Sequence, residues 1–207
     1  MRNPSQKDPL RLIVWMCAGA LVFSACGKSE TETAAVSGQP PVQAVAPAPS
    51  SFSNWVEYVS VPFGFSVLTP KSFDLYKDKS STSAGEIEYL TYLAEMGPVS
   101  FGIVCNDFDP NFLAGVDSKI LLTDGIKGFV EKLGGTTTGE RPVSLAGSEG
   151  REITLTGAAQ GVALYGKARF FLVGNRLYQL AVIAEKGQEN TAAIEHFFES
   201  FKLKAKQ

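Results

Sequence analysis

Two groups of residues in this sequence have types that could do hydrolytic chemistry, but they do not complete a site. Residues 146–150 are Ala-Gly-Ser-Glu-Gly, which imitates the sharp turn that presents a nucleophilic serine, with Ser148 in that position. Alanine stands where the first glycine belongs, and a strand is predicted after the turn where the motif needs a helix. His196, the one histidine in the sequence, lies on a predicted C-terminal helix roughly opposite its apolar stripe, so we expect it to face solvent. No catalytic residue is predicted.

An acidic segment at residues 107–111, Asp-Phe-Asp-Pro-Asn, matches the first three ligand positions of a calcium-binding loop. Phe112 replaces the glycine that such a loop requires, and Ser118 stands where its bidentate glutamate belongs. We therefore expect a polar loop segment at the end of a strand. Cys105 lies in an apolar strand without a nearby histidine or second cysteine, so it is predicted to be a small buried hydrophobic residue. The sequence predicts neither metal ligands nor a bound cofactor.

Three charged residues, Arg151, Glu152 and Arg169, fall inside predicted strands. A charge in a strand is costly unless it is paired or exposed. These residues form either a structural ion pair or a binding face, and their apolar neighbours favour the structural interpretation.

The N-terminus has the pattern of an export signal. Arg2, Lys7 and Arg11 against a single Asp8 form a basic leader, and an apolar run at residues 12–25 ends in small side chains. The leader stays on the cytoplasmic side, so the rest of the chain is expected to be exported. The run of 14 residues is shorter than the roughly 18 to 20 that a membrane-spanning helix needs.

Residues 21–26, Leu-Val-Phe-Ser-Ala-Cys, resemble the lipobox of bacterial lipoproteins, with Phe23 in the position that is normally leucine. The sequence predicts that residues 1–25 are removed and that Cys26 becomes the lipidated first residue. Cys17 is a poorer candidate because bulky residues precede it. The alternative is an ordinary secretory signal that is cleaved nearby and leaves Cys26 as a plain thiol. Gly27, by resemblance to lipoproteins, implies an outer-membrane location facing the periplasm if the cell has an outer membrane.

The remaining chain divides into a tether and one domain. Residues 28–51 contain no aromatic residue, Leu, Ile or Met, so residues 26–51 are expected to be the lipidated cysteine and a disordered tether reaching roughly 25 to 30 Å. Residues 52–207 number 156, the usual size of one domain. Without residues 1–25 the chain has 19 − 3 = 16 basic and 21 − 1 = 20 acidic side chains, a net charge of −4, which argues against a nucleic-acid partner. Cys105 would then be the one free thiol, with no partner for a disulfide.

The apolar periodicity of the domain predicts strands, two helices and a well-defined hairpin. Strands are expected over residues 56–70 with a break at 62–64, then 87–93, 99–105, 141–145, 151–156, 162–173 and 176–184. One helical stripe ends at Gly134-Gly135, and the other follows Asn190 as N-cap and consists of Ile194, Phe197, Phe198 and Phe201. Gly174-Asn175 suits a two-residue type II′ turn. It would pair residues whose numbers sum to 349, for example Phe170 with Gln179, and both faces of this hairpin are apolar enough to require cover.

Four short motifs resemble bacterial relatives of the PsbP family: Phe63-Gly64-Phe65-Ser66-Val67 with Pro70, Gly150-Arg151-Glu152, residues 174–180 and Phe198-Glu199-Ser200-Phe201. PsbP is an extrinsic protein of photosystem II, and a Ran-binding nuclear transport protein shares its fold. The resemblance implies an α+β fold, with an antiparallel sheet flanked by helices on both faces as an α/β/α sandwich. It also implies binding to protein partners and no catalysis.

These features together predict a lipid-anchored envelope protein, held to the membrane through the lipid on Cys26. We expect its domain to present a sheet edge or loops to another envelope protein. A small-ligand carrier and an uncharacterised envelope hydrolase are the alternatives.

Overall fold

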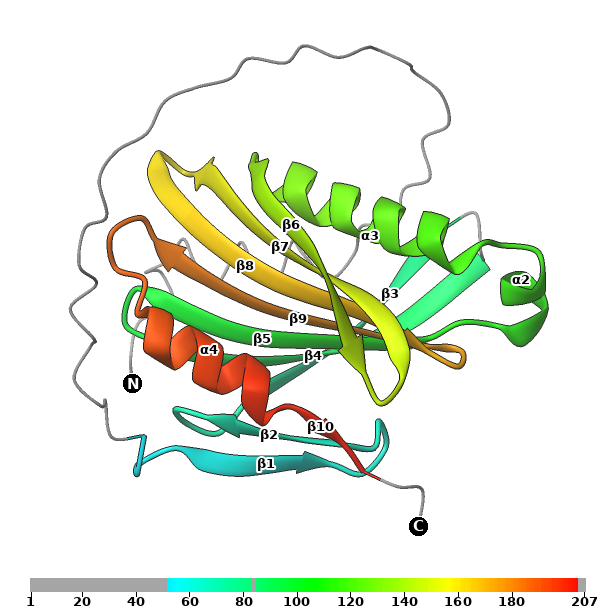
Figure 1. Ribbon diagram of the computed structural model, residues 1–207, viewed down its shortest axis with the longest axis horizontal. Coiled ribbons are helices and arrows are strands. Elements are labelled where there is room, and N and C mark those ends of the chain that lie inside the picture. Colours follow the sequence, from blue (N-terminus) through cyan, green and yellow to red (C-terminus); the bar gives the residue numbers. More distant parts are fainter. Residues whose placement is uncertain (1–51, 83–84, 205–207) are drawn as a thin grey trace, which may run out of the picture.

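The computed structural model describes residues 52–82 and 85–204, which form an α+β fold (Figure 1). Seven antiparallel strands make the main sheet in the order β3-β4-β5-β9-β8-β7-β6. Their bounds are β3 (Asp74–Thr82), β4 (Gly85–Met96), β5 (Val99–Asp107), β6 (Thr136–Leu145), β7 (Ser148–Ala159), β8 (Val162–Val173) and β9 (Arg176–Glu185). A smaller sheet has the order β1-β2-β10, with β1 (Val56–Ser60), β2 (Phe65–Thr69) and β10 (Lys202–Leu203). The helices are α2 (Pro110–Ala114), α3 (Ser118–Lys132) and α4 (Thr191–Ser200).

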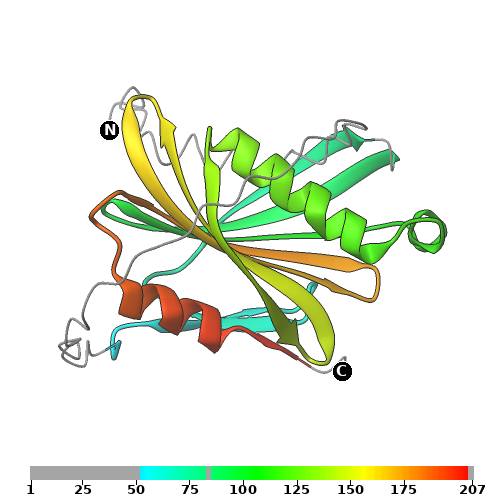
Figure 2. The ribbon, with the colours of Figure 1, turned by 45° about the horizontal axis from the view of Figure 1, so that its top comes forward.

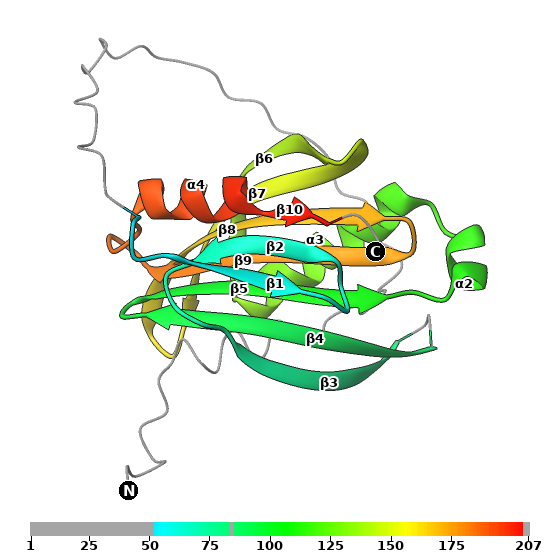
Figure 3. The same ribbon diagram turned by 90° about the horizontal axis from the view of Figure 1, so that it is seen from below.

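The main sheet is covered on both faces, as the apolar faces of the β8–β9 hairpin predict. Helix α3 packs over β6, β7 and β8 on one face (Figures 1 and 2). Helix α4 and the small sheet together form the layer on the other face (Figure 3). None of the helices within the described ranges is long and apolar enough to cross a membrane.

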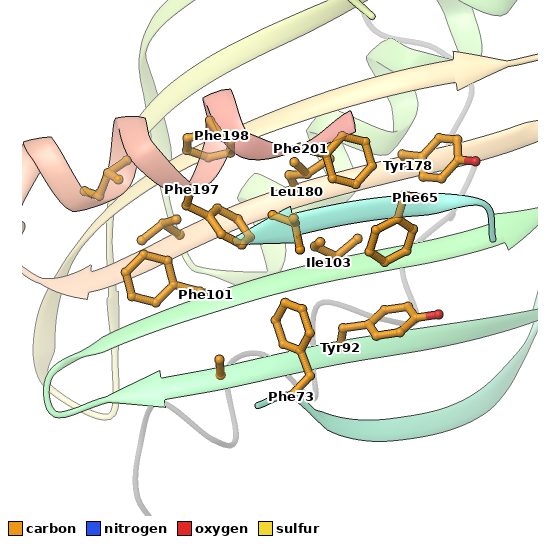
Figure 4. Packing of buried hydrophobic residues seen from close by; sticks show 14 of the residues in the cluster. Phe65, Phe73, Tyr92, Phe101, Ile103, Tyr178, Leu180, Phe197, Phe198 and Phe201 are labelled. Carbon is orange, nitrogen blue, oxygen red and sulfur yellow. The ribbon is translucent and has the colours of Figure 1, made fainter. Parts of the chain in front are cut away.

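Each face of the sheet has its own hydrophobic cluster. The α4 face is rich in aromatic rings, among them Phe65, Tyr92, Phe101 and Phe197, which are all at most 1% exposed (Figure 4). The α3 face packs Phe129 against Phe170, with ring centroids 5.7 Å apart. Burial of these side chains supplies the main driving force for both layers.

The predicted hairpin register is confirmed along its whole length. Strands β8 and β9 pair residues whose numbers sum to 349, from Leu164 with Glu185 to Val173 with Arg176. Gly174 has a positive φ of +62, which the first position of a type II′ turn requires. The alternation also holds, because Phe171 faces α4 whereas Phe170 faces α3.

The two predicted helices are confirmed, and their ends are set by side chains. Asp117 caps α3 by accepting a hydrogen bond from the Lys119 backbone N–H at 2.8 Å. Asn190 caps α4 by accepting one from the Ala193 N–H at 3.0 Å. Gly134, with φ +53, follows the last turn of α3, as predicted from the glycine pair there.

The sandwich prediction needs one correction, since a small sheet shares the second layer with α4. The strands predicted over residues 56–70 form β1 and β2, which do not join the main sheet. Strand β3 was not predicted because its Asp-Leu-Tyr-Lys-Asp-Lys sequence lacks apolar alternation. The short elements α2 and β10 were also missed, and β6 and β7 are longer than predicted because hydrogen bonding to neighbours extends them past their apolar residues.

Arg176 and Tyr178 of β9 hold the turn between β1 and β2. The Arg176 guanidinium donates to both carboxylate oxygens of Asp107, at 2.5 and 2.6 Å, and to the Pro62 carbonyl at 3.2 Å. It also lies 4.6 Å from the centroid of the Phe63 ring, and the Tyr178 hydroxyl donates to the Phe63 carbonyl at 2.6 Å. Two of the motifs that resemble PsbP relatives therefore contact each other, and their role is to attach the small sheet.

Candidate functional site

Charged side chains gather in a row across three adjacent strands, β6, β7 and β8. Glu152 lies directly opposite Arg141 on one side and Arg169 on the other. The Glu152 side chain is only 4% exposed, and it accepts hydrogen bonds from Arg141 Nε at 2.7 Å and Arg169 Nε at 2.6 Å. Lys167 Nζ lies 3.2 Å from the same carboxylate. The alternation of the strands thus brings three cations to one buried carboxylate.

Helix α4 is attached to this row by Glu195 and Phe198. The Glu195 carboxylate accepts a short hydrogen bond from Lys167 Nζ and lies 3.7 Å from Arg169 Nη2. The Phe198 ring lies beneath the Arg169 guanidinium at 4.8 Å, in a cation–π contact. The row therefore links α4 to the sheet.

The electrostatics of Glu152 suit a structural role. Burial raises its pKa, but hydrogen bonds from Arg141, Arg169 and Lys167 outweigh burial, so the pKa lies below its ordinary value. A carboxylate that stays ionised at neutral pH is poorly matched to proton transfer there. The structure supports the ion-pair interpretation for Glu152 and Arg169. Arg151 points to the opposite face, where it donates to Glu140 at 2.7 Å.

One edge of the main sheet, β6, borders a groove of about 400 Å³. Residues of α3, β6 and β7 line it, including Lys119, Leu122, Arg141, Pro142 and Arg151. Pro142 has no N–H to donate, and the β6–β7 register shifts between Thr137 and Gly139. Proline and a bulge are the features that protect an edge strand from pairing with another chain.

The other edge of the main sheet is β3 (Figure 3), which contains no proline and no register shift against β4. Its nine residues pair with β4 without a register shift, from Asp74 with Leu93 to Thr82 with Gly85. Two exposed ion pairs cross from β3 to β4, Lys77 to Glu88 at 2.6 Å and Lys79 to Glu86 at 2.7 Å.

One side of the β3 backbone is directed away from β4. The Lys79 N–H donates to the side chain of its neighbour Asp78 at 2.8 Å, so it does not donate to β4. Hydrogen-bonding direction alternates along a strand, so the N–H and C=O groups of Leu75 and Lys77 also point away from β4. Leu75 is 51% exposed at this edge.

Among the residues considered for chemistry, Ser148 begins β7 directly after a tight turn at Ala146 and Gly147, so it is not at a strand-to-helix elbow. Asp107 pairs with Arg176, and Asp109 caps α2 by accepting from the Asn111 N–H at 2.7 Å. These carboxylates have structural partners.

His196 does not face open solvent, contrary to prediction. Its ring is partly buried and stacks on Phe52, with centroids 4.3 Å apart and planes 11° apart. The Trp55 ring contacts it edge-on at 5.1 Å. The helical pattern could not reveal this contact, because both partners belong to the segment that precedes β1.

Cys105 is fully buried, as predicted, and burial raises the pKa of its thiol well above the ordinary value. Cys26, Cys17 and the tether lie outside the described residues.

Sequence reasoning missed Lys77 and Lys79 as well as Lys167, Arg141 and Glu195. A signal for the first pair exists, since Lys-x-Lys at 77–79 and Glu-x-Glu at 86–88 flank a short polar segment. Complementary charges at alternate positions on either side of a turn are typical of a hairpin.

No family model matches the sequence, and no curated protein compared with it matches. Among solved structures, the solution structure of cyanobacterial PsbP (CyanoP) from Synechocystis sp. PCC 6803 is similar, with a TM-score of 0.53 and 9% identity. The match covers 75% of this chain and 96% of that chain. The crystal structure of PA94, a protein of unknown function and putative regulator from Pseudomonas aeruginosa, matches with a TM-score of 0.35 and 11% identity, covering 69% and 88%. The CyanoP likeness shows that the fold is PsbP-like.

Proposed function

We propose that this protein is a lipid-anchored envelope protein that binds another envelope protein by adding a strand of that partner to β3. The observation that carries the proposal is the edge strand β3, which is nine residues long, has a regular register and contains neither a proline nor a bulge. Extended segments bind such edges through main-chain hydrogen bonds, and side-chain pairs add specificity.

The other edges within the described residues suit this role less well. Strand β6 contains Pro142 and a register shift. Strand β1 has five residues and β10 has two, so each offers few backbone groups. Edge pairing at β3 is therefore the interaction that the fold favours.

The anchor and the binding edge use different parts of the domain. The chain enters the domain at Phe52, whose ring packs on His196 of α4. A tether of about 24 residues from Cys26, reaching roughly 25 to 30 Å, would let the domain search for a partner while the lipid holds it at the membrane. In a Gram-negative cell this partner would lie in the periplasm.

Photo-crosslinking in cells tests the proposal. A photoreactive amino acid replaces Leu75, which is 51% exposed at the β3 edge, and a matched control replaces Ile120 on α3, which is 55% exposed. We expect a discrete adduct with an envelope protein from position 75 alone. The Lys77→Pro substitution removes an outward N–H and should abolish that adduct without loss of folding.

Equal adducts from both positions, or an adduct that persists with Lys77→Pro, would contradict edge docking. Turnover of ester or glycan substrates by the purified protein would favour the hydrolase alternative. A ligand-dependent rise in melting temperature without any adduct would favour the carrier alternative.

A further inference from the structure

The charges of β3 determine which strands can pair with it. Leu75, Lys77 and Lys79 have their backbone groups directed outward, as the Lys79 N–H shows. In an antiparallel pair, outward-directed residues of the two strands lie opposite each other. Two copies of β3 can therefore pair antiparallel only when the residue numbers opposite each other add to an even number.

Antiparallel self-pairing over most of β3 places like charges opposite each other. Three even registers pair at least seven of the nine residues, with sums of 154, 156 and 158. They place Lys77 opposite Lys77, Lys77 opposite Lys79, and Lys79 opposite Lys79, respectively. The middle register also places Asp78 opposite Asp78. Like charges directly opposite destabilise a strand pair, so β3 discriminates against a second copy of this chain.

A strand of different sequence can satisfy the same edge. Lys77 and Lys79 lie on one face of β3 and have Glu88 and Glu86 on their inner side. Acidic side chains on an incoming strand would complete rows of alternating charge on the outer side. Asp78 lies on the opposite face, so the residue between the two acidic ones would be basic or hydroxyl-bearing.

We infer that the partner strand is acidic at two alternate positions, opposite Lys77 and Lys79, and that β3 excludes pairing with its own copy. This inference rests on the proposed function, because it specifies the chemistry of the strand that β3 accepts.

Matched peptides test the charge rule on the full mature chain in detergent. One nine-residue strand-forming peptide carries Glu opposite Lys77 and Lys79 and Lys opposite Asp78, and the control peptide has these charges exchanged. We expect fluorescence anisotropy to show about tenfold tighter binding of the first peptide, from two pairs changed from repulsive to attractive. This preference should weaken at high salt.

A charge-swapped variant provides the decisive comparison. Lys77→Glu and Lys79→Glu combined with Glu86→Lys and Glu88→Lys preserve the β3–β4 ion pairs while reversing the charge at the edge. The variant should prefer the control peptide. If both peptides bind the natural protein equally and Lys77→Pro abolishes both, the charge rule is wrong and edge docking stands. If Lys77→Pro leaves binding unchanged, or neither peptide binds, edge docking and the charge rule both fail.

Sedimentation tests the exclusion of self-pairing. The natural chain should not dimerise through β3. A triple variant combines Asp78→Ser, Lys79→Glu and Glu86→Lys, and it has no like-charge pair in the register with sum 156. This variant should therefore favour a dimer. A dimer of the natural chain that Lys77→Pro dissociates would overturn the exclusion.

Discussion

Replacing Glu152 with glutamine should destabilise the domain strongly although it changes only one heavy atom. Glutamine keeps an acceptor oxygen but carries no negative charge. The side chains of Lys167 and Arg169 are only 9% and 14% exposed, so their positive charges would stay largely buried with less negative charge beside them. Breaking a buried ion pair in this way costs about 3 to 5 kcal/mol. Arg141 is 58% exposed and can return to water, and Glu195 still pairs with Lys167, so we expect the lower end, about 3 kcal/mol.

The same change should alter the pH dependence of stability. The pKa of Glu152 in the folded protein lies below its value in the unfolded chain. Its contribution is therefore complete above the ordinary glutamate pKa of about 4.3 and is lost as the pH falls through the lowered folded-state pKa. The difference between the natural protein and Glu152→Gln should be full at pH 7 and should shrink below about pH 4.

Urea unfolding measured by Trp55 fluorescence gives the free energy of unfolding, since the Trp55 ring packs on Phe101 at 5.5 Å. A loss of about 3 kcal/mol corresponds to a melting temperature lower by roughly 6 to 12 °C for a domain of this size. Glu140→Gln is the matched control, because Glu140 pairs with Arg151 at the surface and should cost at most about 1 kcal/mol. Equal losses in the two variants would refute the assignment of Glu152 as the centre of a buried ion cluster.

Three further changes test the anchor, the turn and the packing of the sheet. Cys26→Ser should release the protein from the membrane fraction; continued sedimentation with membranes would mean that Cys26 is not the lipidated residue. Arg176→Ala should lower the free energy of unfolding by about 1 to 3 kcal/mol. Lys127→Ala is the control, because Lys127 belongs to an exposed pair at 3.9 Å and its loss should change the free energy by less than about 0.5 kcal/mol. Equal losses in urea titrations of the two variants would contradict the role of Arg176 in holding the turn between β1 and β2. Gly150→Ala would place a Cβ 2.3 Å from a ring carbon of Phe171 and should cost about 1 to 3 kcal/mol by thermal melting. Gly115→Ala, with its nearest neighbour at 3.8 Å, should be near neutral, and similar melting temperatures for these two variants would argue against the packing of β7 on β8.

Sequence reasoning succeeded where a local pattern determines the structure. The turn at Gly174 determines every residue pair between β8 and β9, because a two-residue turn defines the register of the hairpin. Since side chains alternate with a period of two, this register also determines which face each side chain occupies. It failed for β3, whose polar residues are stabilised mainly by hydrogen bonding to β4. It also missed two members of the ion cluster, Arg141, which pairs with Glu152, and Glu195, which pairs with Lys167. They lie 11 and 43 residues from Glu152, and only the sheet order and the position of α4 bring them to the cluster. The aromatic contact of His196 was missed for the same reason, because the rings that it touches come from a distant part of the chain.

The small sheet has a consequence for the order in which the domain can fold. Strand β2 pairs on one side with β1 and on the other with β10, and the Leu68 N–H donates to Ser200, 132 residues further along the chain. These contacts close a very large loop of the chain. Such closure is slow, because the chain loses conformational entropy before the stabilising contacts form. An emerging chain can form the β4–β5 hairpin early, but it cannot complete the α4 layer until its last residues are available. A chain truncated before Phe198 would therefore leave the aromatic cluster of that layer uncovered and prone to aggregation.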